Sequence, residues 1–106
     1  MNNATTQIHF AVVENELEVS APPALEPVTD FFETEIGTSD AMLDLIEHHV
    51  RHDRTWRFTG DTCHLRLDAE TVTIEHNYTG ASTNLTRTDL HILLTNLRNI
   101  LAESYG

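Results

Sequence analysis

Residues 56–78 read WRFTGDTCHLRLDAETVTIEHNY, and apolar side chains alternate with polar ones along most of this stretch. A period of two places successive side chains on opposite faces of a sheet. The alternation is interrupted at residues 59–61 and 69–70, which we expect to form turns. The pattern predicts an antiparallel meander of three strands with one covered face, on which Cys63 is a small core residue.

Two segments on either side of this stretch have the period of an amphipathic helix. A Thr-Ser-Asp triplet at residues 38–40 offers three good N-caps, and it precedes a helix that we expect at about residues 40–52. Its expected apolar residues are Met42, Leu45, Ile46, His49 and Val50, and its expected solvent-facing residues are Asp44, Glu47, His48 and His52. A leucine-rich stripe over residues 90–101 predicts a second helix at about residues 87–103.

The N-terminal half is less regular and predicts a hairpin followed by a short helix. Residues 8–12 alternate, and Leu17 and Val19 continue the pattern after a turn at residues 14–16. The short helix is expected within residues 31–36 and ends at Gly37, which favours a helix C-terminus.

The order of these elements predicts a single α+β domain over residues 1–106, a length typical of one domain. We expect an antiparallel β-sheet of about five strands with helices packed on one face. Residues 1–6 are expected to fray at the chain end. Residues 79–84, before the last helix, are expected to form a loop.

Charge is distributed unevenly along the chain. Seventeen carboxylates accompany six arginines and no lysine, and the formal net charge is −11. Residues 1–50 hold ten of the carboxylates and none of the arginines. Such a surface repels nucleic-acid phosphates and anionic membranes, whereas it attracts and steers a cationic protein. We therefore expect a cationic protein partner, with no nucleic acid and no membrane.

Cysteine usage and the start of the sequence predict the compartment. Cys63 is the one cysteine, so it cannot form an internal disulfide. No basic segment followed by an apolar run opens the sequence. Both features predict a cytoplasmic protein in a reducing environment.

No residue pattern selects a catalytic or metal site. Asp44, His48 and His52 fall four residues apart on one helical ridge, and such a ridge can bind zinc. It has no cysteine partner and no His-Glu-x-x-His pattern, so we expect no metal. Other histidines together with an arginine could form a metal-free nuclease, but nothing in their spacing selects them, and the net charge repels the substrate. We expect neither enzymatic activity nor a cofactor.

The carboxylates of the N-terminal half are the remaining candidates for a site. Some occupy the predicted hairpin, and the others surround the start of the middle helix. A merely solvated surface has the same composition, but the uneven distribution favours a surface that docks a basic protein. The predicted partner-binding residues are Glu14, Glu16, Glu18, Glu33, Glu35, Asp40, Asp44 and Glu47.

The second half of the chain resembles a known bacterial family. The likeness is carried by Trp56, Gly60, Leu65, Leu67, Asp68, Glu70, Val72, Ile74 and Asn77, and in the final helix by Asp89, Leu90, Leu93, Leu94, Arg98, Asn99, Ile100 and Leu101. Over about residues 54–103 these spacings resemble the YacL family of small acidic bacterial proteins. The chain departs from that family in the loop before the last helix, which is short and lacks an acidic insertion. The resemblance implies a cytosolic protein with a housekeeping or regulatory role.

In size, acidity and cysteine usage the chain also resembles the immunity proteins of contact-dependent growth inhibition. Those bacterial proteins bind and neutralise a cognate toxin domain, often a basic nuclease. The resemblance implies that the acidic N-terminal half faces the toxin. Because it accounts for the charge asymmetry, a toxin-neutralising immunity protein is the function that we expect first, and the YacL-like role is the alternative.

Overall fold

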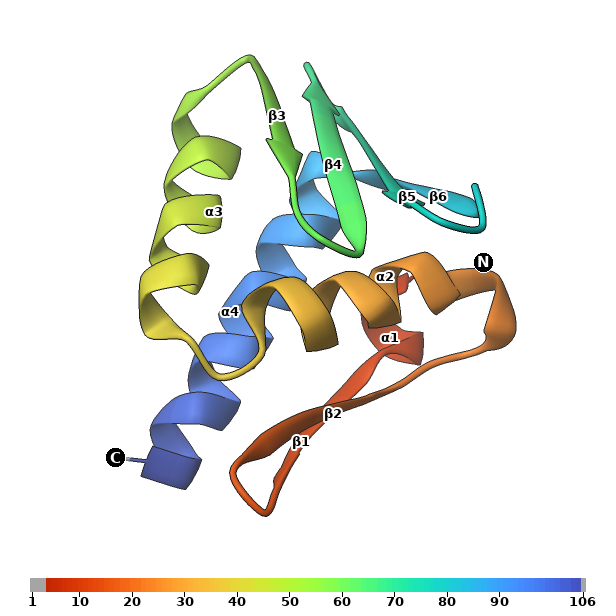
Figure 1. The fold of residues 1–106 in the computed structure, drawn as a ribbon. Helices are drawn as coiled ribbons and strands as arrows, with labels where there is room; N and C mark the ends of the chain where they lie inside the picture. Colours follow the sequence, from red (N-terminus) through yellow and green to blue (C-terminus); the bar gives the residue numbers. More distant parts are fainter. Residues whose placement is uncertain (1–3, 106) are drawn as a thin grey trace.

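The computed structural model describes residues 4–105 and combines helices with antiparallel strands (Figure 1). The helical segments are α1 (Ala4–Gln7), η1 (Pro23–Leu25), α2 (Glu26–Asp30), η2 (Phe31–Ile36), α3 (Asp40–His52) and α4 (Arg87–Tyr105). The strands are β1 (His9–Val13), β2 (Glu16–Ser20), β3 (Thr55–Thr59), β4 (Cys63–Asp68), β5 (Thr71–His76) and β6 (Ser82–Thr86). The predicted α+β class is confirmed. Of the segment 1–6 that we expect to fray, residues 1–3 lie outside the described residues, whereas residues 4–6 belong to α1, which contacts α4.

The strands form two antiparallel sheets. β3, β4, β5 and β6 lie side by side in this order, whereas β1 and β2 pair only with each other. The sheet of about five strands that the sequence predicts is therefore a four-stranded sheet accompanied by a hairpin. At the free edge of β2, the N–H of Val19 donates to the Glu33 carboxylate of η2 at 2.7 Å. The edge of β2 is thus joined to the helical segment η2. In a larger sheet, another strand would occupy this position.

The segment before α4 contains a strand where we expected a loop. β6 pairs with β5 along its whole length, and its buried residue Leu85 lies opposite Val72. Leu85 is the one apolar residue of β6, so the sequence shows no alternation there. Backbone hydrogen bonds with β5 hold β6 at the edge of the sheet. β6 therefore joins the sheet with one buried side chain.

α3 has the predicted bounds, but its buried stripe differs from the expected one. The Ser39 hydroxyl accepts a hydrogen bond from the N–H of Met42 at 3.1 Å, which caps the helix. Leu43 is buried, whereas Leu45 is 43% exposed. Both are leucines, so composition does not distinguish them. Contact of α3 with η2 and α4 determines which one is covered.

α2 and η2 form one helical segment that is longer than the predicted one. Pro27 lies in its first turn, where the missing N–H has no intrahelical partner to lose. Gly37 follows η2 with φ of +55°, a conformation that favours glycine. This segment carries Phe31 and Phe32 into the core.

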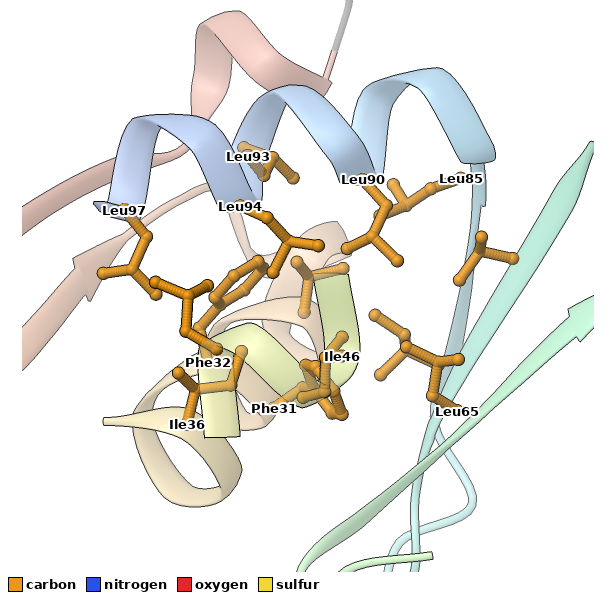
Figure 2. Packing of buried hydrophobic residues seen from close by; sticks show 14 of the residues in the cluster. Phe31, Phe32, Ile36, Ile46, Leu65, Leu85, Leu90, Leu93, Leu94 and Leu97 are labelled. Carbon is orange, nitrogen blue, oxygen red and sulfur yellow. The ribbon is translucent and has the colours of Figure 1, made fainter. Parts of the chain in front are cut away.

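α2, η2 and α4 lie between the hairpin and the four-stranded sheet, and α3 packs beside them against η2 and α4 (Figure 1). Phe31, Phe32 and Ile46 lie between the leucines of α4 and Leu65 of β4 (Figure 2). The opposite face of the four-stranded sheet is lined with polar and charged side chains and is uncovered. Within residues 4–105, no helix has both the length and the apolar character needed to cross a membrane.

Cys63 is a core residue, as predicted, and this gives a testable pH dependence. Its side chain has no exposed surface, and burial raises the pKa of the thiol from 9.0 to about 11. The folded state disfavours the thiolate. The free energy of unfolding should therefore have its full value below about pH 9 and fall as the pH rises to about 11. Urea unfolding of wild type should show this fall, by roughly 2 kcal/mol relative to Cys63→Ala. Parallel pH profiles for the two proteins would contradict it.

Candidate functional site: an acidic surface

Two adjoining surface hollows lie where the hairpin turn meets the beginning of α3. The larger, of about 650 Å³, is lined by Asn15, Thr38, Asp40, Asp44, Arg98, Leu101 and Ala102. The second, of about 560 Å³, is lined by Asn15, Glu16, Leu17, Glu18, Glu33, Gly37 and Thr38. Asn15 and Thr38 line both hollows. The fold therefore gathers carboxylates from β2, η2 and α3 around one concave region.

The hairpin places its carboxylates outward through local geometry. Glu14 and Asn15 form the turn, and both have positive φ values, 52° and 67°. This is the arrangement of a two-residue turn that matches strand twist. Leu17 is buried, so Glu16 and Glu18 point away from the core. None of the three glutamates has a hydrogen-bond or ion-pair partner among the described residues.

Asp40 lies in the first turn of α3 and is exposed. A carboxylate there interacts favourably with the helix dipole. Glu33 lies across the second hollow, and one of its oxygens accepts the hydrogen bond from Val19. We use the name acidic surface for the set of Glu14, Glu16, Glu18, Glu33, Asp40 and Asp44.

Asp44 faces solvent as expected, with 65% of its side chain exposed, whereas Glu47 does not, and both carboxylates are bound to the same arginine. Arg98 of α4 donates to Asp44 at 2.7 Å and to Glu47 at 2.9 Å, and the Glu47 side chain is 18% exposed. The hydrogen bond with Asp44 raises the pKa of the Arg98 guanidinium. Both carboxylates therefore join α3 to α4. Asp44 still lines the larger hollow, whereas Glu47 lines neither.

Glu35 lies away from the acidic surface and has an internal role. Its Oε2 accepts hydrogen bonds from the N–H groups of Thr62 and Cys63, both at 2.9 Å. A Cβ at Gly60 would overlap the Glu35 carboxylate, so a larger residue there would displace this carboxylate from its observed position. The carboxylate thus holds the β3–β4 turn against η2. Of the eight predicted residues, Glu35 and Glu47 are the two that the fold separates from the rest.

The histidine ridge of α3 does not converge with a third ligand. The ring centroids of His48 and His52 are 4.7 Å apart, but the Asp44 carboxylate binds Arg98. Within the part of the chain that the structure describes, no three or more metal-binding side chains are grouped. His49 is half-buried, as expected, and it stacks on Trp56 at 4.2 Å between ring centroids.

Sequence reasoning missed Asn15, Thr38 and Arg98 as members of the site. The turn at residues 14–16 was the only available signal for Asn15. Arg98 lies 54 residues from Asp44, and no local pattern indicates that contact. Its role follows only from the packing of α4 on α3.

Comparison with known proteins found no family model, no curated protein and no solved structure that matches this chain. The resemblances to the YacL family and to immunity proteins therefore stay predictions. A function for this chain has to be inferred from the geometry of the acidic surface.

Proposed function

We propose that this chain is a toxin-neutralising immunity protein, which binds a cationic toxin domain through the acidic surface. The observation that carries the proposal is the concave region shared by the two hollows. Carboxylates from three elements surround it, although these elements are separated in sequence. The two hollows are lined by five carboxylates and one arginine, Arg98, and an excess of one sign of charge in a concave region attracts the opposite charge.

Internal pairing distinguishes the carboxylates that are available to a partner. Asp44 is bound to Arg98 and Glu33 to Val19 N–H, so part of their hydrogen-bonding capacity is used. Glu16, Glu18 and Asp40 have no such partner among the described residues, and all three are exposed. Their mutual repulsion disfavours the folded state. A basic partner would relieve this repulsion, and we assign the main contacts to these three residues.

The proposal predicts that neutralising these three residues weakens binding without affecting the fold. The probe is the product of the gene immediately upstream, tested for binding by calorimetry and for growth inhibition in a co-expression strain. Wild type should bind and restore growth. Glu16→Gln/Glu18→Gln/Asp40→Asn should bind roughly 30-fold more weakly, or about 2 kcal/mol, because rim charge pairs contribute modestly.

A control with the same change in charge separates a local surface from net charge. Asp61→Asn/Glu70→Gln/Glu75→Gln removes three carboxylates that lie on the four-stranded sheet and its turns, outside both hollows. This variant should bind within about twofold of wild type, since exposed charges far from the contact are screened. Equal loss in both triple variants would contradict the assignment to the acidic surface. Absence of any binding would contradict the immunity function.

A further inference from the structure

We propose a second docking surface of opposite charge, formed by the uncovered face and free edge of strands β3 and β4. The chemistry of Arg57 and Arg66 fits an extended, glutamate-bearing segment of a partner protein. This arginine surface consists of Thr55, Arg57, Thr59, His64 and Arg66. It shares no residue with the acidic surface, so it goes beyond the proposed function and can be tested independently.

The first observation is a pair of like charges that the fold places together. Arg57 lies directly opposite Arg66 in the β3–β4 register, and both are exposed. Like charges at directly opposite positions destabilise a sheet. Neither guanidinium has a hydrogen-bond or ion-pair partner among the described residues, although the chain has seventeen carboxylates. The pair is unfavourable for folding and available to a ligand.

Two other arginines of the chain have clear structural roles and provide a contrast. Arg87 donates to four backbone carbonyls, and Arg98 donates to two carboxylates. Their donors are used within the fold. Arg57 and Arg66 have no equivalent role in the described structure, and the fork of donors on each is free to bind a carboxylate in bidentate geometry.

The second observation is the free edge of β3. Gly60 N–H donates to Cys63 O, and Ala69 N–H donates to Arg54 O, both at 2.9 Å. Because hydrogen-bonded pairs alternate with non-bonded ones in an antiparallel ladder, the N–H and C=O groups of Thr55, Arg57 and Thr59 point away from β4. β3 has no neighbour on that side in the sheet. These groups can therefore pair with an added strand.

The third observation is a pair of hollows separated by the two arginines. One, of about 470 Å³, is lined by Thr55, Trp56, Arg57, Arg66, Leu67 and Asp68. The other, of about 130 Å³, is lined by Arg57, Phe58, Thr59, His64, Leu65 and Arg66. Both depressions can receive side chains of a segment that lies along the edge. Alternate residues of that segment face the arginines, so glutamates with a period of two fit this surface.

The test is a titration of the full ¹⁵N-labelled chain with a short capped peptide in which Glu and Val alternate. The amide resonances of Thr55, Arg57 and Thr59 should shift selectively, and their hydrogen exchange should slow. The same peptide with Gln in place of Glu should bind at least about tenfold more weakly, because it lacks the charge-assisted contacts.

Matched arginine variants complete the test. Arg66→Gln should weaken binding of the glutamate peptide about tenfold, whereas Arg51→Gln, an equal change in charge at an exposed position of α3, should leave it within about twofold. The melting temperature of Arg66→Gln should rise by about 2 °C, since a repulsive cross-strand pair is removed. A folding defect therefore cannot explain the lost binding.

Three outcomes overturn the proposal. They are equal binding of the glutamine peptide, equal loss in Arg66→Gln and Arg51→Gln, and shifts of the β3 amides by a single-stranded oligonucleotide but not by the glutamate peptide. Loss of toxin binding in the acidic-surface variant has no bearing on these results, so the two proposals can fail separately.

Discussion

Replacing Arg87 with methionine is expected to lower the free energy of unfolding by about 3 kcal/mol. The guanidinium donates to Val50 O at 2.6 Å, to Asp53 O and Ala69 O at 2.7 Å, and to Arg54 O at 3.0 Å. Val50 O is one of the last carbonyls of α3, which have no intrahelical partner. Arg87 thus ties the end of α3, the following loop and the β4–β5 turn to the start of α4. Methionine keeps the apolar stem but removes the donor from Val50 O, Asp53 O and Ala69 O, whereas Arg54 O keeps its hydrogen bond from the N–H of Ala69.

Urea unfolding of Arg87→Met and two controls checks this prediction. Arg87→Lys should recover little, because one ammonium cannot reach four carbonyls in the geometry of the guanidinium fork. Arg51→Met, at an exposed position of α3, should change stability by no more than about 0.5 kcal/mol. Similar stabilities for Arg87→Met and Arg51→Met would show that the carbonyl contacts do not stabilise the fold.

Phe32→Ala is expected to have the largest effect on stability, a loss of about 4 kcal/mol. The side chain is fully buried, and its ring packs edge-on against Phe10 of the hairpin at 5.1 Å and against Phe31 at 5.9 Å between centroids. Phe31 in turn packs against Phe58 of β3 at 5.9 Å. These rings join the hairpin, η2 and the four-stranded sheet. A two-stranded hairpin is marginal by itself, so its contact with Phe32 is needed for order.

Thermal unfolding and amide exchange together check the second prediction. In Phe32→Ala the amides of β1 and β2 should lose protection before those of β4 and β5. Tyr78→Ala is the control, because Tyr78 is 80% exposed and its truncation should change stability by no more than about 0.5 kcal/mol. Uniform loss of protection across both sheets would contradict the role of Phe32 as the anchor of the hairpin.

Elements with a strong hydrophobic period could be predicted from the sequence. The alternation in residues 56–78 identified β3, β4 and β5, and the N-cap triplet identified the start of α3. β6 could not be recognised, because Leu85 is its one apolar residue. The separation into two sheets was also hidden, as was the hydrogen bond between Val19 and Glu33 at the edge of β2. Such tertiary contacts leave no periodic pattern.

The candidate site was predictable only where local geometry determines exposure. Alternation with Leu17 indicated that Glu16 and Glu18 face outward. No local feature distinguished Glu35, whose partner Cys63 lies 28 residues away. The same holds for Asp44 and its partner Arg98. Charge counts located the acidic half of the chain, and only the fold separated its free carboxylates from those with internal partners.

The dependence of the association rate on salt tests the proposed function most directly. Stopped-flow mixing with the toxin domain should show the rate falling at least about tenfold as the ionic strength rises from about 0.01 M to about 0.15 M, because the Debye length shrinks from ~30 Å to ~8 Å. Glu16→Gln/Glu18→Gln/Asp40→Asn should lose most of this dependence, and Asp61→Asn/Glu70→Gln/Glu75→Gln should keep it. A rate that ignores salt and is the same in all three proteins would contradict docking through the acidic surface.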